Sequence, residues 1–543
     1  MVSLAGRWGS RRGENLAVFL VSWLIYLGLS LRLLALDVHF GDAVARTAAA
    51  FSVFFSRDPH LANLGFAWNP LPAVLQLPLV AVLRLLGGDV LLAGPLQSSL
   101  AGALLLVVLN AWVRLYPIPR ALRWAMVGLL GVNPMIALYA ANGMSEAVFF
   151  LLTSLAVIGF LRWAEIGSVR GFILLTGATM LVLQTRFEAL PLTAAFALCF
   201  APVMFPLARF LGLEVRADRI EAHLVTYLAA AAYSFGLWVF FNWIIVGDPL
   251  YFLRGAYSNA AQTALVAGPA VGCYTRGEPA WLNALLFTGD RLVALSPALP
   301  IVALATAIYA TLRRNIVVLC TLVIFGSVPI FHFMLLLQGS SYGWLRFFAI
   351  GIVATFILVV QTARLAPWLV KGKIGAFGWP LLLGMLLVSD IASWVAMNRP
   401  DMSCEEWVVV GRVMDETRSA PLYSLAVERG IDRLLSEIAP DGKVLADSVL
   451  GFAMPLVASD PRRYVINSDR DFERILASPV GAVRFVLVAK PEGLGQIDRI
   501  NQEYPELWES GGDWVRLVAD FGESRGLWRL YEVQSDASPE SGA

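Results

Sequence analysis

Apolar stretches of about 20 residues recur through roughly the first 400 residues of this 543-residue chain. Each stretch is long enough to cross the roughly 30 Å hydrocarbon core of a bilayer as an α-helix. With 58% hydrophobic and 15% charged residues, the composition is too apolar for a soluble globular protein of this size. Because lipid offers the backbone no hydrogen bonds, runs of this length favour helices over a barrel. The sequence therefore predicts a polytopic α-helical membrane protein.

Basic residues fall in clusters between these stretches, for example Arg114, Arg120 and Arg123, and later Arg313 and Arg314. By the positive-inside rule such clusters lie on the cytoplasmic side. Placing helices between the clusters predicts about eleven spans in the plasma (inner) membrane, a cytoplasmic N-terminus and an outer C-terminal region. The expected spans are 16–36, 91–115, 121–141, 146–163, 171–187, 189–208, 224–246, 286–312, 315–337, 346–364 and 375–397.

The outer loops are expected at 37–90, 142–145, 247–285 and 338–345. Within the first of them, the segment 70–86 is apolar but contains three prolines, at positions 70, 72 and 78. Proline removes backbone donors and kinks a helix, so this segment is expected to form an interfacial helix rather than a span.

The two parts of the chain carry opposite charge. Residues 1–397 hold 25 Lys+Arg and 15 Asp+Glu, whereas residues 398–543 hold 16 and 25. After Asn398 the pattern changes to short β-rich runs that alternate with amphipathic stretches. We therefore expect a transmembrane module over 1–397 and a soluble extracytoplasmic α/β domain over 398–543. The expected strands are 443–446, 463–466, 483–488, 515–518 and 528–533, and the expected helices are 422–438, 469–477 and 495–504.

The four cysteines divide into two pairs. Cys199 and Cys320 fall inside predicted spans, where a thiol packs as a small apolar residue. Cys273 and Cys404 both fall on the predicted outer side, where disulfides persist. A Cys273–Cys404 disulfide is the only pairing between outer cysteines, and the alternative is two free thiols far apart in space.

Polar residues that could carry chemistry gather in the loops and helix ends of the predicted outer side, where desolvation shifts pKa values. They are Asp37, His39, Asp42, Glu146, Arg186, Glu188, Arg291, Tyr342 and Arg346. Several have a plainer interpretation. Ser145 and Glu146 could simply begin a helix. Arg186 and Glu188 could be a local ion pair, and Arg346 could extend to lipid headgroups.

Cofactor signals are weak. Asp58 and His60, together with His39, match no established metal spacing, so a divalent cation has no support in the sequence. No glycine-rich phosphate loop or dinucleotide fingerprint occurs in the C-terminal region. A nucleotide-sugar or ATP substrate is therefore unsupported, and no nucleic-acid partner is predicted.

Several short motifs follow one another along the predicted outer loops over roughly residues 15–365. In chain order they are Gly41-Asp42, Trp68-Asn-Pro70-Leu-Pro72, Asn133-Pro134, Ser145-Glu146, Arg186-Phe-Glu188, Arg291-Leu-Val-Ala-Leu-Ser-Pro297 and Gly343-Trp-Leu-Arg346. This order resembles the GT-C superfamily of membrane glycosyltransferases, which includes protein O-mannosyltransferases and lipid A aminoarabinose transferases. Seven predicted helices before the long outer loop also fit the shared module of that family.

The resemblance implies an inverting transfer of a sugar from a polyprenyl phosphate to an extracytoplasmic glycan, lipid or protein of the cell envelope. Asp42 would be the general base that removes the acceptor hydroxyl proton. Arg186, Arg291 and Arg346 are the cations available for the departing phosphate. Many relatives carry a second acid beside the first, but Ala43 follows Asp42 here. Asp37 or Glu146 would then substitute for it.

Two other functions compete with this interpretation. A polytopic transporter or flippase of lipid-linked sugars should show internal repeats and helices broken near mid-membrane. The sequence contains no convincing repeat, and its ionisable residues gather at one face. A catalytically inactive scaffold that binds a cell-wall partner is the second alternative, against which the intact Asp42 argues.

Overall fold

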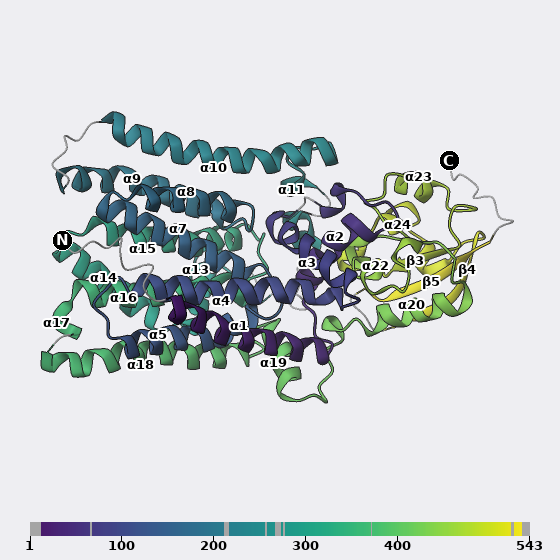
Figure 1. The fold of residues 1–543 in the computed structure, drawn as a ribbon. Coiled ribbons are helices and arrows are strands. Elements are labelled where there is room, and N and C mark those ends of the chain that lie inside the picture. Colours follow the sequence, from purple (N-terminus) through teal and green to yellow (C-terminus); the bar gives the residue numbers. More distant parts are fainter. Residues whose placement is uncertain are drawn as a thin grey trace.

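A bundle of long helices carries a small sheet domain at one end (Figure 1). The computed structural model describes residues 12–65, 68–210, 217–255, 258–265, 273–274, 277–370, 372–522 and 526–534. The end of the bundle that adjoins the sheet domain is called the sheet end below.

Seven helices in the described part of the chain are long and apolar enough to cross a membrane, which fits a polytopic helical membrane protein. They are α1 (Arg12–Ala35), η3 with α4 (Val90–Val113), α7 (Glu146–Ile166), α10 (Ala217–Val246), α15 (Ile316–Leu337), η4 with α16 (Leu345–Leu365) and α18 (Gly372–Met397). The pair α13 (Ala280–Leu295) and α14 (Ala298–Leu312) would make an eighth span, bent by 96° at Ser296-Pro297.

The predicted number of about eleven spans is therefore wrong. Helices form in all eleven predicted segments, but several are short or broken. The helix α8 (Val169–Leu183) has 15 residues and reaches only about 22 Å, less than the thickness of the hydrocarbon core. The segment 121–141 breaks into α5 (Arg120–Val132) and α6 (Pro134–Tyr139), because Asn133 caps α6 and Pro134 opens it. Hydropathy alone does not detect such interruptions.

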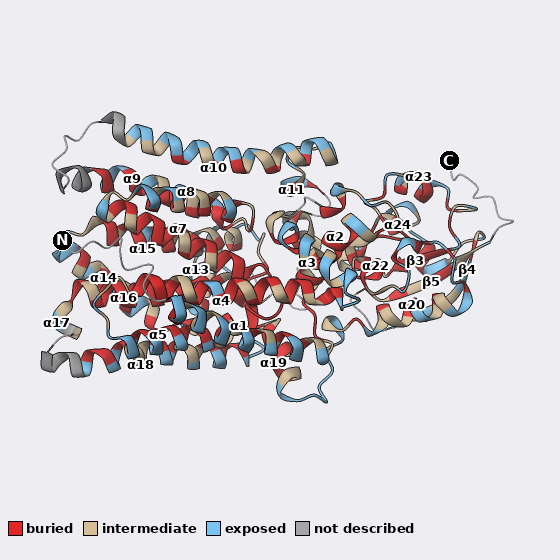
Figure 2. Ribbon diagram, viewed as in Figure 1, coloured by how far each residue is buried: buried red, intermediate tan, exposed pale blue. Residues whose placement is uncertain are grey.

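Burial separates central helices from peripheral ones. In the apolar windows of α16 and α7, 94% and 83% of residues are buried, against 22% in α1 and in α10. Figure 2 shows the same contrast, with α10 exposed along much of its length. The exposed side chains of α10 include Tyr233, Trp243 and Ile244, which suits contact with lipid.

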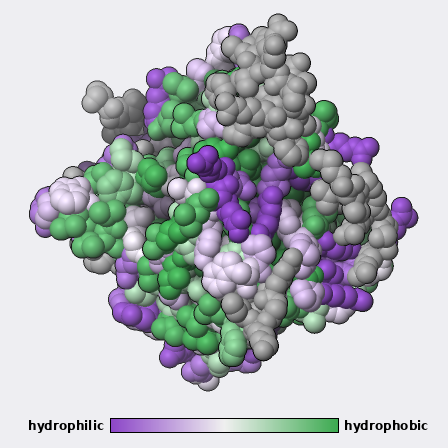
Figure 3. All heavy atoms as spheres, turned by 90° about the vertical axis from the view of Figure 1, so that its left-hand side faces the viewer, coloured by the Kyte–Doolittle hydropathy of each residue, from purple (hydrophilic) through white to green (hydrophobic). Residues whose placement is uncertain are grey.

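The segment after α1 forms short helices at the sheet end. They are α2 (Gly41–Phe55), η2 (Leu61–Leu64) and α3 (Leu71–Leu85), the last within the predicted interfacial segment. The bundle also contains α9 (Ala189–Phe210), of 22 residues, and the short helices α11 (Tyr251–Arg254), α12 (Asn259–Leu265) and α17 (Pro367–Val370). The opposite end carries several groups of hydrophilic side chains among hydrophobic ones (Figure 3).

All five predicted strands form, and they lie in one sheet of order β2-β1-β3-β5-β4. The strands are β1 (Val444–Ala446), β2 (Tyr464–Val465), β3 (Phe485–Ala489), β4 (Val515–Phe521) and β5 (Trp528–Val533). The first three are parallel, and β5 is antiparallel to β3 and β4. The helix α19 (Glu406–Met414) follows α18 and packs against the bundle. Helices of the sheet domain include α20 (Ala426–Ile438), α21 (Ser448–Gly451), α22 (Met454–Val457), α23 (Phe472–Ala477), α24 (Arg499–Glu503) and α25 (Leu507–Ser510). The β3 side chains are all buried, as expected for a central strand.

Candidate functional site

Five segments that are distant in sequence bring charged side chains together at the sheet end. The first turns of α2 and α7, the α8–α9 turn, the 3₁₀ helix η4 and the chain after α18 each contribute. We call this group the arginine–carboxylate cluster; its members are Asp42, Glu146, Arg186, Glu188, Arg346 and Glu405. Five of the six belong to the set of site residues predicted from the sequence.

Arg346 is the centre of the cluster. Its guanidinium donates to Asp42 Oδ2 at 3.1 Å and lies 2.9 Å from Glu405 Oε2 and 3.5 Å from Glu146 Oε1. The Arg346 side chain is only 2% exposed, and its guanidinium carbon lies 4.0 Å from the centre of the Trp344 ring. A buried arginine held by three carboxylates and an aromatic face does not extend to lipid headgroups.

Arg186 forms the second half of the cluster. It donates to Glu146 Oε1 at 2.5 Å and to Glu188 Oε1 at 2.7 Å, so Glu146 bridges the two arginines. His332 of α15 lies 3.3 Å from Glu188. Burial alone would raise the pKa of the Glu188 carboxyl, but Arg186 and His332 outweigh burial and hold this pKa below its ordinary value. Arg186 and Glu188 thus form more than a local pair.

Local backbone geometry explains why Glu146 points into the cluster. Ser145 precedes α7 but makes no side-chain cap; its hydroxyl instead accepts from Arg186 at 3.3 Å. Gly143 has φ +81°, and a Cβ there would lie 3.0 Å from Pro95, so glycine is required on both counts. The tight turn presses the start of α7 against α4. As a result, the Glu146 side chain is only 1% exposed.

Asp42 is the most accessible carboxylate of the cluster, with 32% of its side chain exposed. Only its Oδ2 atom receives a hydrogen bond from the described residues, and that bond comes from Arg346. Tyr342 lies nearby: burial, reinforced by the Asp42 charge, raises its pKa above the ordinary value. The Tyr342 ring stacks on Trp344 with centroids 4.4 Å apart. Asp42 therefore keeps part of its carboxylate accessible next to the stacked Tyr342 and Trp344 rings.

Arg46 lies one turn after Asp42 on α2 and differs from the other two arginines. Its one hydrogen bond within the described structure goes to the Asp42 backbone carbonyl at 3.4 Å, and its buried Nε has no partner there. Its guanidinium carbon lies 5.3 Å from the centre of the Trp68 ring. Burial lowers the pKa of Arg46, although Asp42 and Glu146 oppose the shift. Arg46 is thus a partly buried cation whose Nε lacks a partner in the described structure.

Asp37 and His39 lie outside the cluster, at the contact between the bundle and the sheet domain. Asp37 accepts hydrogen bonds from Ser424 Oγ at 2.5 Å, Leu425 N at 3.1 Å and Arg429 Nη1 at 2.7 Å, and lies 2.9 Å from His39 Nε2. Burial alone would raise the pKa of Asp37, but these hydrogen bonds and the Arg429 charge outweigh burial and hold the pKa below its ordinary value. Because its three donors at 424–429 lie at the start of α20, Asp37 joins the bundle to the sheet domain.

A second set of ion pairs supports the same contact. Arg57 donates to Asp469 at 2.9 Å and also pairs with Asp471, while the Arg470 backbone donates to Asp58 at 3.0 Å. The loop after α2 is thereby fixed to the sheet domain. Asp58 and His60 are engaged in this region, since His60 Nδ1 lies 2.7 Å from the Asp58 carbonyl.

Arg291 is separate from the cluster in its recorded contacts. It pairs with Asp290 at 2.6 Å and donates to the Asp401 carbonyl at 3.0 Å, and its guanidinium carbon lies 4.2 Å from the centre of the Phe287 ring. These contacts hold the chain that follows α18. The structure therefore places Arg291 against the chain that follows α18, apart from the arginine–carboxylate cluster.

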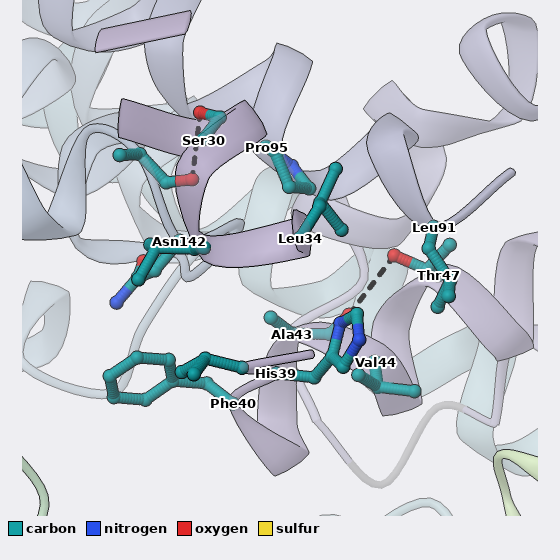
Figure 4. Close-up of a pocket in the computed structure, with 13 residues that line it drawn as sticks. Ser30, Leu34, His39, Phe40, Ala43, Val44, Thr47, Leu91, Pro95 and Asn142 are labelled. Carbon is teal, nitrogen blue, oxygen red and sulfur yellow. Dashed lines mark hydrogen bonds between the residues drawn. The ribbon is translucent and has the colours of Figure 1, made fainter. Parts of the chain in front are cut away.

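Two cavities flank the Asp37 segment. The first, of about 20 Å³, lies between α1, α2 and α4 and is bounded by His39, Thr47 and Asn142, as Figure 4 shows. It has room for about one water molecule and is far too small for a sugar ring. The second is an open cleft of about 380 Å³ that Asp37, Arg412 and Arg418 help to line. Asp42 lines neither cavity.

Sequence reasoning missed three residues of the site: Arg46, His332 and Glu405. The helical spacing of Asp42 and Arg46 was a usable signal, because residues four apart share a helix face. Nothing in the sequence indicates Glu405, which belongs to the region assigned to the soluble domain. His332 lies within a long apolar run, and an ionisable residue there was an overlooked functional signal.

Among the described residues, no group of three or more histidine, cysteine or acidic side chains has the geometry to hold a metal ion. Comparison with protein-family models and with curated protein sequences finds no match to this chain.

Proposed function

We propose that the protein is an inverting glycosyltransferase that moves a sugar from a polyprenyl-phosphate donor to an acceptor outside the cytoplasm. One observation carries the proposal. A partly exposed carboxylate, Asp42, and an under-partnered guanidinium, Arg46, lie one helical turn apart on α2, beside an arginine–carboxylate cluster. The reaction needs one base and one phosphate-binding cation at such a place.

Asp42 acts as the base in this proposal. An acceptor hydroxyl is a poor nucleophile until a carboxylate within hydrogen-bond reach removes its proton. Arg346 fixes one oxygen of Asp42, and the other remains open to the acceptor. Attack on the anomeric carbon breaks its bond to the phosphate oxygen, so the leaving group is the polyprenyl phosphate and the centre inverts.

Arg46 binds the donor phosphate in this proposal, in addition to the arginines predicted from the sequence, which are Arg186, Arg291 and Arg346. Arg346 and Arg186 already contact carboxylates, so new bonds there require displacing an existing partner. Arg46 has an unpartnered Nε among the described residues, and its guanidinium fork matches a phosphate. A charge on the departing phosphate is stabilised most in a dry site with preorganised donors.

The orientation follows from the same proposal. The sheet end and the sheet domain lie on the extracytoplasmic side of the plasma membrane, and the N-terminus lies on the cytoplasmic side. The basic linkers after α4 and α14 support this orientation through the positive-inside rule. The acceptor would be a glycan, lipid or protein of the cell envelope.

Mass spectrometry of envelope glycans, lipids and glycoproteins tests the function. We expect a deletion strain to lack one sugar, and the wild-type gene to restore it. The Asp42→Asn variant should not restore it. The matched control is Asp89→Asn, which changes a carboxylate in the same loop whose recorded contact is the cap of η3, and it should restore the sugar. An unchanged envelope in the deletion strain would refute the proposal.

A further inference from the structure

The chain between α18 and α19 is fixed at several consecutive residues. We call residues 403–406 the connector, because they lead from the last long helix towards the sheet domain. Ser403 Oγ donates to Glu406 Oε2 at 2.8 Å, and Tyr139 OH donates to Glu406 Oε1 at 2.6 Å. Cys404 forms the predicted disulfide with Cys273, which the structure confirms. The connector is therefore a rigid element beside the cluster.

The same disulfide reaches the loop that carries Arg346. The Cys273 backbone donates to the Tyr342 carbonyl at 2.8 Å, and the Cys404 backbone N lies 3.0 Å from Cys273 Sγ. Gly343 has φ +66°, and a Cβ there would lie 2.7 Å from Tyr274 Cβ, so the loop passes close to the chain after Cys273. The covalent bond thus joins the segment that presents Glu405 to Cys273, and the Cys273 segment in turn is hydrogen-bonded to the loop that leads to Arg346.

We propose that Glu405 is a positioning residue of the site and that the Cys273–Cys404 disulfide is the clamp that keeps Glu405 against Arg346. Glu405 lies 2.9 Å from the Arg346 guanidinium, and that guanidinium donates to Asp42. The connector thereby fixes the carboxylate that takes the acceptor proton, without touching the substrate itself. The catalytic consequence rests on the proposed function; the structural clamp does not.

The charge of the Glu405 carboxyl should make the site depend on pH. Burial raises the pKa of Glu405 to about 8; Arg346 opposes the shift, and Glu406, Asp42 and Glu146 reinforce it. Glu405 therefore changes charge near neutral pH, while it faces these four groups. A residue that only supports the fold would not confer a pH dependence on the site in this range.

Hydrogen exchange tests the clamp without any substrate. We expect backbone exchange in residues 342–349 to accelerate about tenfold in Glu405→Ala and in the Cys273→Ser/Cys404→Ser double variant. Exchange in β3 should stay unchanged in both, which shows that the sheet domain remains folded. Glu416→Gln, an exposed carboxylate paired with Arg32 in the same region, is the matched control and should behave as wild type. Wild-type exchange over 342–349 in both test variants would overturn the proposal.

A double-mutant cycle in the transfer assay tests the connection between the disulfide and Glu405. We expect Glu405→Ala to lower kcat about tenfold, and to lower it less than about twofold further when both cysteines are already replaced. Glu405→Gln should retain most of the rate but lose the inflection near pH 8. Additive losses, or an unchanged pH profile in Glu405→Gln, would overturn the proposal. Absence of transfer by the wild-type protein would instead refute the proposed function.

Discussion

Asp37 and Asp42 lie close together in one segment after α1, yet the structure gives their carboxylates different tasks. Their side chains are similarly accessible, at 27% and 32%, so exposure does not separate them. Hydrogen bonds do. Asp37 accepts from Ser424, Leu425 and Arg429 and also lies against His39, whereas Asp42 accepts from Arg346 alone among the described residues.

The comparison shows how to distinguish a structural carboxylate from a reactive one. A carboxylate whose lone pairs are all occupied stabilises a contact and has little capacity for a proton from a substrate. One that is oriented through a single oxygen keeps the other available. The arginines follow the same rule: Arg186 and Arg346 pair with carboxylates, whereas Arg46 pairs with none among the residues that the structure describes.

The sharpest test of this comparison is the pair Asp42→Asn and Asp37→Asn in purified protein. We expect Asp42→Asn to fold and bind donor normally but to lower kcat by about 10²-fold or more, because the amide cannot take the proton. Asp37→Asn should change kcat less than about threefold. Equal losses in the two variants would remove the distinction between the carboxylates.

The contrast among the arginines predicts the next largest effect. We expect Arg46→Ala to raise the KM for the donor by about tenfold or more, since a charge-assisted hydrogen bond contributes about 1.5–3 kcal/mol. Arg46→Lys should recover only part of the loss, because the planar fork is gone. Arg254→Ala is the control, because this exposed arginine pairs with Asp248 away from the cluster. Donor KM values equal to wild type in both Arg46 variants would contradict the assignment.

For the docking of the sheet domain we expect the reverse order, with a larger effect of Asp37→Asn than of Asp42→Asn. We expect Asp37→Asn to weaken the docking of the sheet domain by about 2 kcal/mol, because bonds to a charged acceptor are lost. Asparagine tolerates the left-handed backbone at this position, where φ is +54°, so the change tests the charge. Limited proteolysis of the chain between α18 and α20 measures the loosening. Asp42→Asn should be cleaved at the wild-type rate.

Acid should produce the smallest and most specific effect. The pKa of Asp37 is lower in the folded protein than in the unfolded chain, so its contribution is present above about pH 4 and is lost as pH falls further. We expect proteolysis of the same segment to increase below about pH 4 in the wild-type protein and less steeply in Asp37→Asn. Parallel pH dependences in the two proteins would show that Asp37 does not hold the domain.

The sequence predicted the helical bundle, the five strands and the disulfide because hydropathy, period-two patterns and cysteine placement are local signals. The number of spans was wrong where proline breaks a helix or a helix is too short, as in α5 and α8. Apolar composition is the same in a broken helix as in a continuous one.

The site was predictable only in part. Five of the six cluster residues were predicted from the sequence, in an outer loop or at the outer ends of predicted spans, but their pairing depends on three-dimensional packing. Asp37 resembled Asp42 in sequence, and only the start of α20 distinguishes them. Glu405 pairs with Arg346 but lies after the last long helix in the sequence, in the region assigned to the soluble domain. A contact of that kind has no local sequence signature.

The account depends most on a single displacement at the anomeric carbon of the donor, in which Asp42 takes the acceptor proton and polyprenyl phosphate leaves. Proton NMR of the product that purified wild-type protein forms from the donor identified in the cellular glycan analysis tests this directly. We expect a transferred sugar with the anomeric configuration inverted relative to the donor. A product that retains the donor configuration, or no transferred sugar at all, would contradict the account.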